Sequence, residues 1–237
     1  MNGPDILTLD LYESLKQPGC PICNAGVIAE RRYMGFFLRE YVNDVQARIK
    51  LQNSWGFCNL HAWQLQELEL YESNDGLGNA ILYEWMVART IISTKKVKQQ
   101  LMQNLKTAYF NFKSKPADVT ETFRKTQECP VCSVSINSKS FHLETLVQKL
   151  AEDEFIKRYN ASDGLCLQHF IQALDLPVDR NLLQILCDLQ ISRMSNILNN
   201  LNSYIGKHDY QNKEAYTADE EAALIKAVSL MAGNKRI

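Results

Sequence analysis

The feature that most constrains this chain is a cysteine–histidine pattern that occurs twice. The first copy has Cys-Pro-Ile-Cys at 20–23 and, after 34 further residues, Cys-x2-His at 58–61. The second has Cys-Pro-Val-Cys at 129–132 and, after 33 residues, Cys-x2-His at 166–169. The first cysteines of the two copies are 109 positions apart and the third are 108 apart, whereas the residues between them agree poorly. The pattern therefore indicates an internal duplication.

The eight cysteines and histidines of this pattern have the chemistry of zinc ligands. Zinc prefers four tetrahedral ligands drawn from thiolate and imidazole, and Cys3His is a common structural set. A Cys-x2-Cys turn presents two sulfurs from a tight knuckle, which the proline restricts in advance. A Cys-x2-His pair on the first turn of a helix places both side chains on one face. We predict two zinc ions per chain, and the candidate ligands are Cys20, Cys23, Cys58, His61, Cys129, Cys132, Cys166 and His169.

The duplication allows two ways of combining these ligands. In the first, each copy completes its own site, so that Cys20 and Cys23 meet Cys58 and His61. In the second, the knuckle of one copy meets the helix start of the other. We predict the within-copy arrangement, because a duplicated unit should first have existed with a complete site.

Three other chemistries fit parts of the pattern. An iron–sulfur cluster held by three cysteines and one histidine stays open, because sequence does not identify the metal. A redox dithiol of the thioredoxin type needs a strand before its motif, whereas residues 11–19 have the character of a helix end. A nucleophile–base pair of Cys58 and His61 leaves two cysteines per copy unexplained. Cys187, His142 and His208 have no counterpart in the other copy and are expected to be ordinary residues.

Apolar residues recur at helical spacing along the whole chain, which predicts an all-α fold. One stripe, from Val27 to Val45, predicts a single buried helix face. A second, from Leu77 to Phe112, predicts a long helix with a basic outer side. Thr217 and Glu220 form a capping-box pattern, which predicts a last helix over 218–232. The expected architecture is pseudo-twofold with one Cys3His site per copy, divided as a first repeat at 1–112, a linker at 113–128 and a second repeat at 129–237.

Composition restricts the function more than it identifies it. Lys+Arg 26 against Asp+Glu 27 leaves a formal charge of −1, so no overall field favours nucleic acid or an anionic membrane. The first residues lack a basic segment followed by an apolar run, and no apolar stretch approaches the roughly 20 residues of a membrane-spanning helix. Seven cysteines in such a chain suggest a reducing cytoplasm. No phosphate loop or nucleophile elbow is present. We expect a non-enzymatic, metal-stabilised interaction or regulatory module with an unidentified protein partner.

The motifs CPIC, YVNDV and GFCNLHAW, continued by CPVC and GLCLQH, resemble an uncharacterised family of prokaryotic cytosolic proteins that carry this paired Cys/His pattern. The resemblance extends from about residue 5 to residue 232. Its most specific part is the Gly-Phe-Cys-x2-His element, and the second copy is looser. The family has no established activity, so the resemblance supports the ligand pattern and implies no function.

Overall fold

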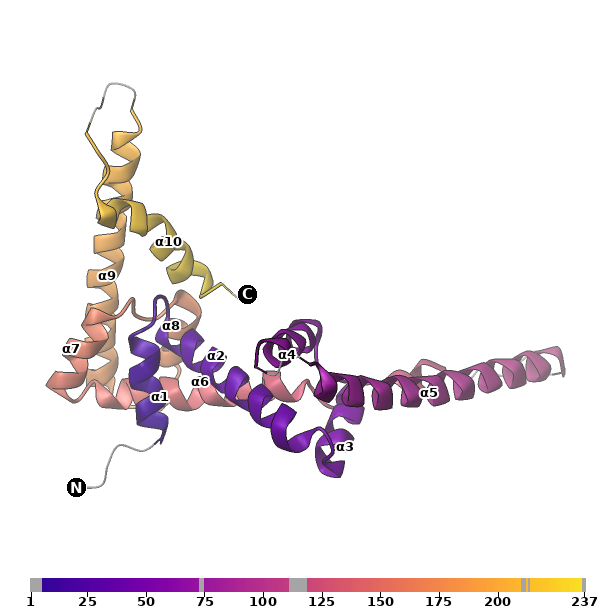
Figure 1. The fold of residues 1–237 in the computed structure, drawn as a ribbon. Coiled ribbons are helices and arrows are strands. Elements are labelled where there is room, and N and C mark those ends of the chain that lie inside the picture. Colours follow the sequence, from indigo (N-terminus) through magenta and orange to yellow (C-terminus); the bar gives the residue numbers. More distant parts are fainter. Residues whose placement is uncertain (1–5, 73–74, 111–118, 210–211, 213, 236–237) are drawn as a thin grey trace. The chain divides into compact units, whose positions relative to one another are not determined.

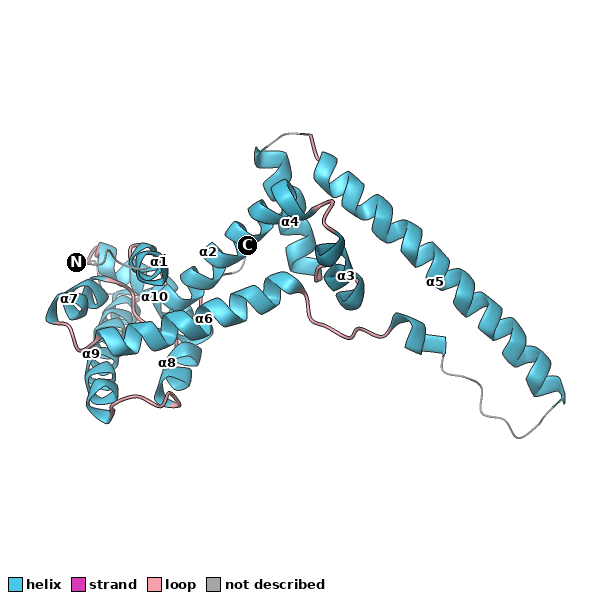
Figure 2. Cartoon of the chain, turned by 90° about the horizontal axis from the view of Figure 1, so that it is seen from below, coloured by secondary structure: helices cyan, strands magenta, loops and turns pink. Residues whose placement is uncertain are grey.

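The structure is a computed structural model that describes all residues except 1–5, 73–74, 111–118, 210–211, 213 and 236–237. Helices and their connections make up the described part of the chain, which contains no strand (Figure 2). The all-α prediction is confirmed. The α-helices, in chain order, are α1 (Ile6–Leu15), α2 (Pro21–Phe36), α3 (Val45–Ser54), α4 (Asn59–Glu72), α5 (Leu77–Phe110), α6 (Pro130–Lys149), α7 (Asp153–Ala161), α8 (Leu167–Leu174), α9 (Arg180–Lys207) and α10 (Ala218–Ala232).

The chain forms two compact units that do not follow its linear order (Figure 1). Unit 1 comprises Met1–Ala29 and Ser135–Ile237, and unit 2 comprises Glu30–Val134. The boundaries between them fall inside α2 and α6. The units therefore differ from the expected halves 1–112 and 129–237, which describe the two sequence copies. Of the expected linker, Val119–Phe123 forms the short 3-10 helix η2, and 113–118 lies outside the described residues.

Unit 1 is built on a core in which α6 contributes a fully buried face. Leu143 and Leu146 of α6, and Leu150 directly after it, are all buried, and they pack with the aromatic rings of α7 and the leucines of α1 and α9. The last helix, α10, packs against α9 and α8. It begins at the predicted capping box, where the Thr217 side chain accepts from the Glu220 N–H and the Glu220 carboxylate accepts from the Thr217 N–H.

Unit 2 contradicts the prediction of one continuous buried face from Val27 to Val45. Helix α2 passes into a π-helical turn, η1 (Phe37–Tyr41), and α3 begins only after a break. The Asp44 side chain caps α3 by accepting a hydrogen bond from the Ala47 N–H at 2.7 Å. The extra residue of the π-turn and the break change which side chains face the core, so Val45 is 67% exposed whereas Val42 and Leu51 are buried.

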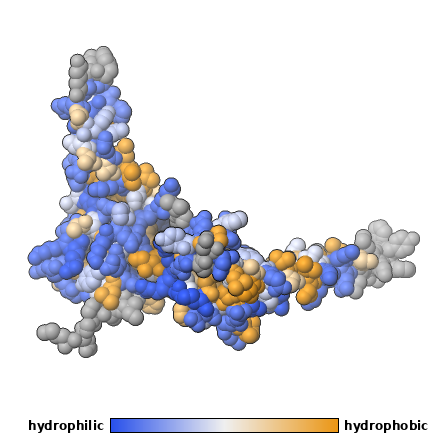
Figure 3. Space-filling view, viewed as in Figure 1, coloured by the Kyte–Doolittle hydropathy of each residue, from blue (hydrophilic) through white to orange (hydrophobic). Residues whose placement is uncertain are grey.

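Helix α5 confirms the predicted long helix but not its burial. Leu82 is fully buried near its start, whereas further along apolar and basic residues are exposed together. Within 77–102, where the side chains of α5 are described, the exposed apolar residues are Leu77, Val87, Ile91, Ile92, Leu101 and Met102. Figure 3 shows apolar side chains gathered at the surface around α3 and the start of α5. Helical spacing therefore predicted the element and not its environment. In the described part of the chain, no helix combines the length and the hydrophobicity that crossing a membrane requires.

Candidate metal centres

The structure brings all eight candidate ligands into two groups of four. Within each group, the potential ligand atoms lie within 4.8 Å of one another. Site 1, in unit 1, comprises Cys20, Cys23, Cys166 and His169. Site 2, in unit 2, comprises Cys58, His61, Cys129 and Cys132.

The within-copy arrangement is therefore wrong. Each site combines the Cys-Pro-x-Cys motif of one sequence copy with the Cys-x2-His motif of the other. Each compact unit nevertheless holds one Cys3His group. The unit boundaries lie inside α2 and α6, so the Cys-Pro-x-Cys motif of each sequence copy belongs to the same unit as the Cys-x2-His motif of the other copy. The reason for the error is physical. Spacing fixes which side chains project together from one helix start, but the packing of the long helices decides which helix starts meet.

Both motifs in site 1 occupy the same local structure, the first turn of a helix. Cys20 immediately precedes α2, and its carbonyl accepts from the Asn24 N–H at 3.0 Å. Cys166 is the N-cap of α8, and its carbonyl accepts from the Phe170 N–H at 2.8 Å. The second ligand of each pair follows three residues later, so both side chains of a pair project from the same end of the helix.

Site 2 repeats this construction at the starts of α4 and α6. The carbonyl of Cys58 accepts from the Ala62 N–H at 2.9 Å, and that of Cys129 accepts from the Ser133 N–H at 3.1 Å. Four helix N-termini, two at each site, thus direct their positive dipole ends toward sulfur atoms. Such ends stabilise thiolates.

The separate knuckle predicted for Cys-Pro-x-Cys is also wrong. Pro21 and Pro130 are the first residues of α2 and α6. Proline suits this position because its fixed φ is helical and its missing N–H would lack an intrahelical partner there anyway. The chain turns sharply two residues before each Cys-x2-His motif, where Gly56 and Gly164 have φ of +92° and +72°, a region that favours glycine.

The distances in site 2 are those of four ligands around one point. Nδ1 of His61 lies 3.1 Å from the Cys58 Sγ, 3.6 Å from the Cys129 Sγ and 3.4 Å from the Cys132 Sγ. The Sγ atoms of Cys58 and Cys132 are 3.7 Å apart. In both sites Nδ1 is the histidine nitrogen that faces the sulfurs.

Site 1 has nearly the same dimensions. Nδ1 of His169 lies 3.4, 3.5 and 3.2 Å from the Sγ atoms of Cys20, Cys23 and Cys166, respectively. The Sγ atoms of Cys23 and Cys166 are 4.0 Å apart. Both groups therefore present one imidazole nitrogen and three sulfurs at similar mutual separations.

Burial and short hydrogen bonds shift the pKa values of neighbouring groups in these clusters in opposite directions. In site 2, burial lowers the pKa of His61, but its contacts with Cys129 and Glu30 outweigh burial and raise that pKa to about 10. Burial raises the pKa of Cys129, but hydrogen bonds from His61 and the backbone lower it to about 6. Burial and the neighbouring Cys129 charge raise the pKa of Cys132 to about 12.

Site 1 is divided in the same way. Hydrogen bonds with Cys166 and Cys20 lower the pKa of Cys23. Hydrogen bonds with Cys166 and Cys23 raise the pKa of Cys20. Burial lowers the pKa of His169, but hydrogen bonds with Cys166 and Cys23 raise it to about 9. The directions of these shifts favour a thiolate at Cys23 and at Cys129, and a proton on Cys20, on Cys132 and on both histidines. A divalent cation that binds here must displace those protons.

A buried carboxylate stands behind the histidine of site 2. Oε2 of Glu30 is 3.6 Å from the His61 Nε2, on the ring edge opposite to the sulfurs, and both side chains are almost completely buried. In metal sites, the histidine nitrogen that does not bind the metal commonly donates a hydrogen bond to a carboxylate, which orients the ring. The sequence reasoning missed Glu30, which stands ten positions after Cys20 and corresponds to Lys139 in the second copy.

The C-terminal segment supports site 1 instead. Oδ1 of Asn234 accepts from the Cys20 N–H at 2.7 Å, and its Nδ2 donates to the Asn24 Oδ1 at 2.6 Å. A Cβ atom at Gly233 would lie 3.4 Å from the Cys23 Sγ, so the backbone passes close above the cluster. Neither residue belongs to the repeated pattern, and sequence spacing contained no signal for them.

The remaining cysteine and histidines lie outside both groups of four. Cys187 lies on α9 and belongs to neither four-residue group. His142 is buried in α6, where its Nδ1 donates to the Ser138 carbonyl at 2.6 Å. His208 follows α9 and packs against the Tyr204 ring.

Two comparisons with known proteins match nearly the whole length of this chain. Residues 3–236 match a family described as "Family of unknown function (DUF6062)". An "Uncharacterized 23.9 kDa protein in xynA 3'region" of Caldicellulosiruptor sp. (strain Rt8B.4) is 24% identical over 232 residues, which cover 95% of this chain and 100% of that protein. No solved structure matches.

Proposed function

We propose a function for this chain, which belongs to the DUF6062 family of unknown function: it binds two zinc ions as structural staples of a non-catalytic interaction or regulatory protein. Site 1 would hold one ion through Cys20, Cys23, Cys166 and His169. Site 2 would hold the other through Cys58, His61, Cys129 and Cys132.

The separations between the ligand atoms carry this proposal. Tetrahedral zinc with Zn–S near 2.3 Å and Zn–N near 2.05 Å places two sulfurs about 3.8 Å apart, and a sulfur and a nitrogen about 3.5 Å apart. One S–S distance in each site is 3.7 or 4.0 Å, and the N–S distances run from 3.1 to 3.6 Å. These separations are close to those around a single tetrahedral ion, which supports one ion per site.

The same distances disfavour the iron–sulfur alternative. Each protein ligand of a four-iron cluster binds a different iron atom, so the ligand atoms must stand farther apart than ligands of one ion. Here the potential ligand atoms of each group lie within 4.8 Å of one another. The geometry supports one ion per site better than a cluster.

Four protein ligands leave a zinc ion no open position for water or substrate, which supports a structural and non-hydrolytic role. The ions would join helix starts that are far apart along the chain, such as Cys23 and Cys166 in site 1. The apolar residues that α5 exposes support an interaction role, because surface of this kind is often covered by a partner. The free, closely spaced thiols support the cytoplasm as the location.

Elemental analysis of protein purified without oxygen tests the proposal. We expect two zinc ions per chain and no visible absorption. Removing the metal with a chelator should lower the melting temperature strongly, because the binding free energy of structural zinc is also folding free energy. A well-folded protein without metal, or a coloured one containing iron and sulfide, would contradict the proposal.

A further inference from the structure

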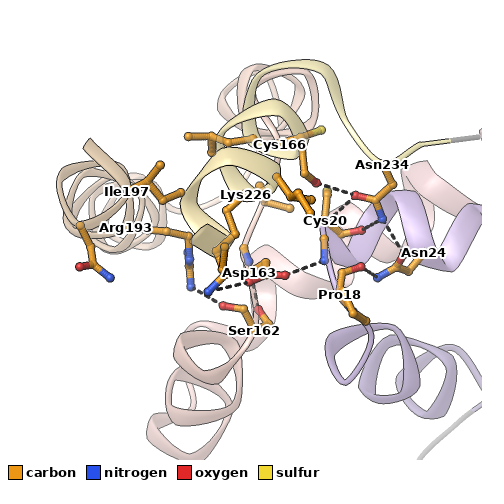
Figure 4. Close-up of a pocket in the computed structure, with 18 of the residues that line it drawn as sticks. Pro18, Cys20, Asn24, Ser162, Asp163, Cys166, Arg193, Ile197, Lys226 and Asn234 are labelled. Atoms are coloured by element: carbon orange, nitrogen blue, oxygen red, sulfur yellow. Dashed lines mark hydrogen bonds and ion pairs between the residues drawn. The ribbon is translucent and has the colours of Figure 1, made fainter. Parts of the chain in front are cut away.

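A large pocket lies beside site 1, entirely within unit 1 (Figure 4). Its volume is about 990 Å³, at the upper end of the range for small-molecule sites. Two ligands of site 1, Cys20 and Cys166, line one part of it, together with Asn234. Residues of α9 and α10 line the opposite part.

The charged side chains of the pocket are predominantly basic. Arg193, Lys226 and Lys235 line it against one carboxylate, that of Asp163. The Asp163 Oδ2 accepts from the Gly19 N–H at 2.7 Å, and its Oδ1 is 3.9 Å from the Lys226 Nζ, a weak ionic contact. The lining therefore has a surplus of two positive charges.

Arg193 is held in place without losing its charge to a carboxylate. Its Nη2 donates to the carbonyls of Tyr159 at 3.0 Å and Ser162 at 3.2 Å. Its guanidinium also lies over the Tyr159 ring, 4.9 Å from the centroid. Within the described residues, no acidic side chain forms an ion pair with it. Its positive charge is therefore not neutralised by a neighbouring carboxylate.

Apolar side chains complete the lining. Leu189 and Ile197 contribute from α9, and Ile225 and Leu230 from α10. A lining that combines basic and apolar side chains fits a ligand with an anionic group and an apolar body, because such a ligand can contact both kinds of side chain at once.

We propose that this pocket binds a small organic anion, and that zinc in site 1 holds two of its walls. The role of zinc in holding the walls rests on the proposed zinc function. The segments Pro18–Cys20 and Gly164–Cys166 both line the pocket and both end in a ligand of site 1. An ion that joins the two cysteines would fix these segments relative to each other. A ligand bound between them would in turn stabilise the loaded site, because coupling between two binding sites is reciprocal.

Anilinonaphthalene sulfonate, an aromatic ring system with one negative charge, is a suitable probe for the zinc-loaded full chain. Fluorescence titration should show one saturable site. Lys226→Glu should weaken binding about tenfold, because it replaces an attraction with a repulsion. Lys157→Glu is the matched control, an exposed lysine on α7 outside the pocket, and should leave binding unchanged. Equal effects of the two variants, or none, would overturn the anion pocket.

A steric variant tests the place of binding independently of charge. Ser192 lines the pocket and Ser195 does not, and both are exposed on α9. Ser192→Trp should remove saturable binding and Ser195→Trp should preserve it. Binding that survives Ser192→Trp at full affinity would place the probe elsewhere.

The coupling is tested with Cys58→Ala, which leaves site 1 as the intact zinc site. The probe should slow zinc release from this variant severalfold, and it should not slow release from Cys166→Ala, which keeps site 2. Equal release rates with and without the probe would refute the coupling. If wild-type protein binds no zinc but still distinguishes Lys226→Glu from Lys157→Glu, the proposed zinc function fails and the pocket stands.

Discussion

Sites 1 and 2 have the same four ligand types on the same local structure, but their supports differ. In both, a Cys-Pro-x-Cys helix start and a Cys-x2-His helix start converge, and Nδ1 of the histidine faces the sulfurs. Behind site 2 stands the buried carboxylate of Glu30. Over site 1 lies the C-terminal segment, with Asn234 bonded to the backbone of Cys20.

This difference shows that the ligand motif and its surroundings are separable. The motif requires only a helix start with the correct two side chains, which each sequence copy supplies twice. The groups that contact the ligands from behind come from whichever segments pack around that helix start, and these differ between the units. We therefore expect the sites to resemble each other in coordination and to differ in metal affinity and in their coupling to a ligand.

The largest expected effect concerns which cysteines share an ion. Cys20→Ala combined with Cys166→Ala should remove one ion and leave one, because both residues belong to site 1. Cys20→Ala combined with Cys58→Ala should weaken both sites, so that a competing chelator removes both ions. Zinc content measured in the presence of that chelator separates the variants.

The within-copy arrangement predicts the reverse order for these two double variants, so the same measurement can contradict the structure. Loss of a structural ion should also destabilise the affected unit by several kcal/mol. Hydrogen exchange would show which unit opens.

A smaller effect is expected from the carboxylate of site 2. Glu30→Gln should lower the zinc affinity of site 2 by about 10- to 100-fold, because the carboxylate behind His61 orients its ring and raises its basicity. Chelator competition should show one weakened ion and one unchanged ion. A uniform loss at both sites, or none, would mean that Glu30 does not distinguish them.

The support of site 1 should matter less, because the C-terminal segment is partly exposed and water can replace it. Asn234→Ala removes the acceptor for the Cys20 N–H, which should cost about 1 kcal/mol, or roughly fivefold in zinc affinity at site 1. Zinc release from Cys58→Ala with and without Asn234→Ala measures this effect. A change at site 2 in the Cys166→Ala background would contradict the assignment.

Cys187→Ala should have the smallest effect. Cys187 lies outside both groups of four, and its thiol contributes no ligand to either. Zinc content and the order of zinc release should match those of the wild type. Loss of an ion in this variant would reveal a ligand exchange that the structure does not show.

Much of the local structure could be predicted because its causes are local. The Thr217 and Glu220 capping box predicted α10 with its correct bounds, since its hydrogen bonds join residues three apart. The stripe from Val27 to Val45 failed because a π-turn at Phe37–Tyr41 and the cap at Asp44 change the direction of the side chains within it. A periodic pattern contains no information about such an interruption.

The sequence by itself determined which eight side chains have ligand chemistry and which pairs act together, because a spacing of three residues on a helix start fixes the direction of both side chains. Only the tertiary structure decided that each site joins the two copies, that Glu30 stands behind His61, and that Asn234 reaches Cys20. These contacts join residues from 31 to 214 positions apart. They depend on how the helices pack, which the spacing of a motif cannot specify.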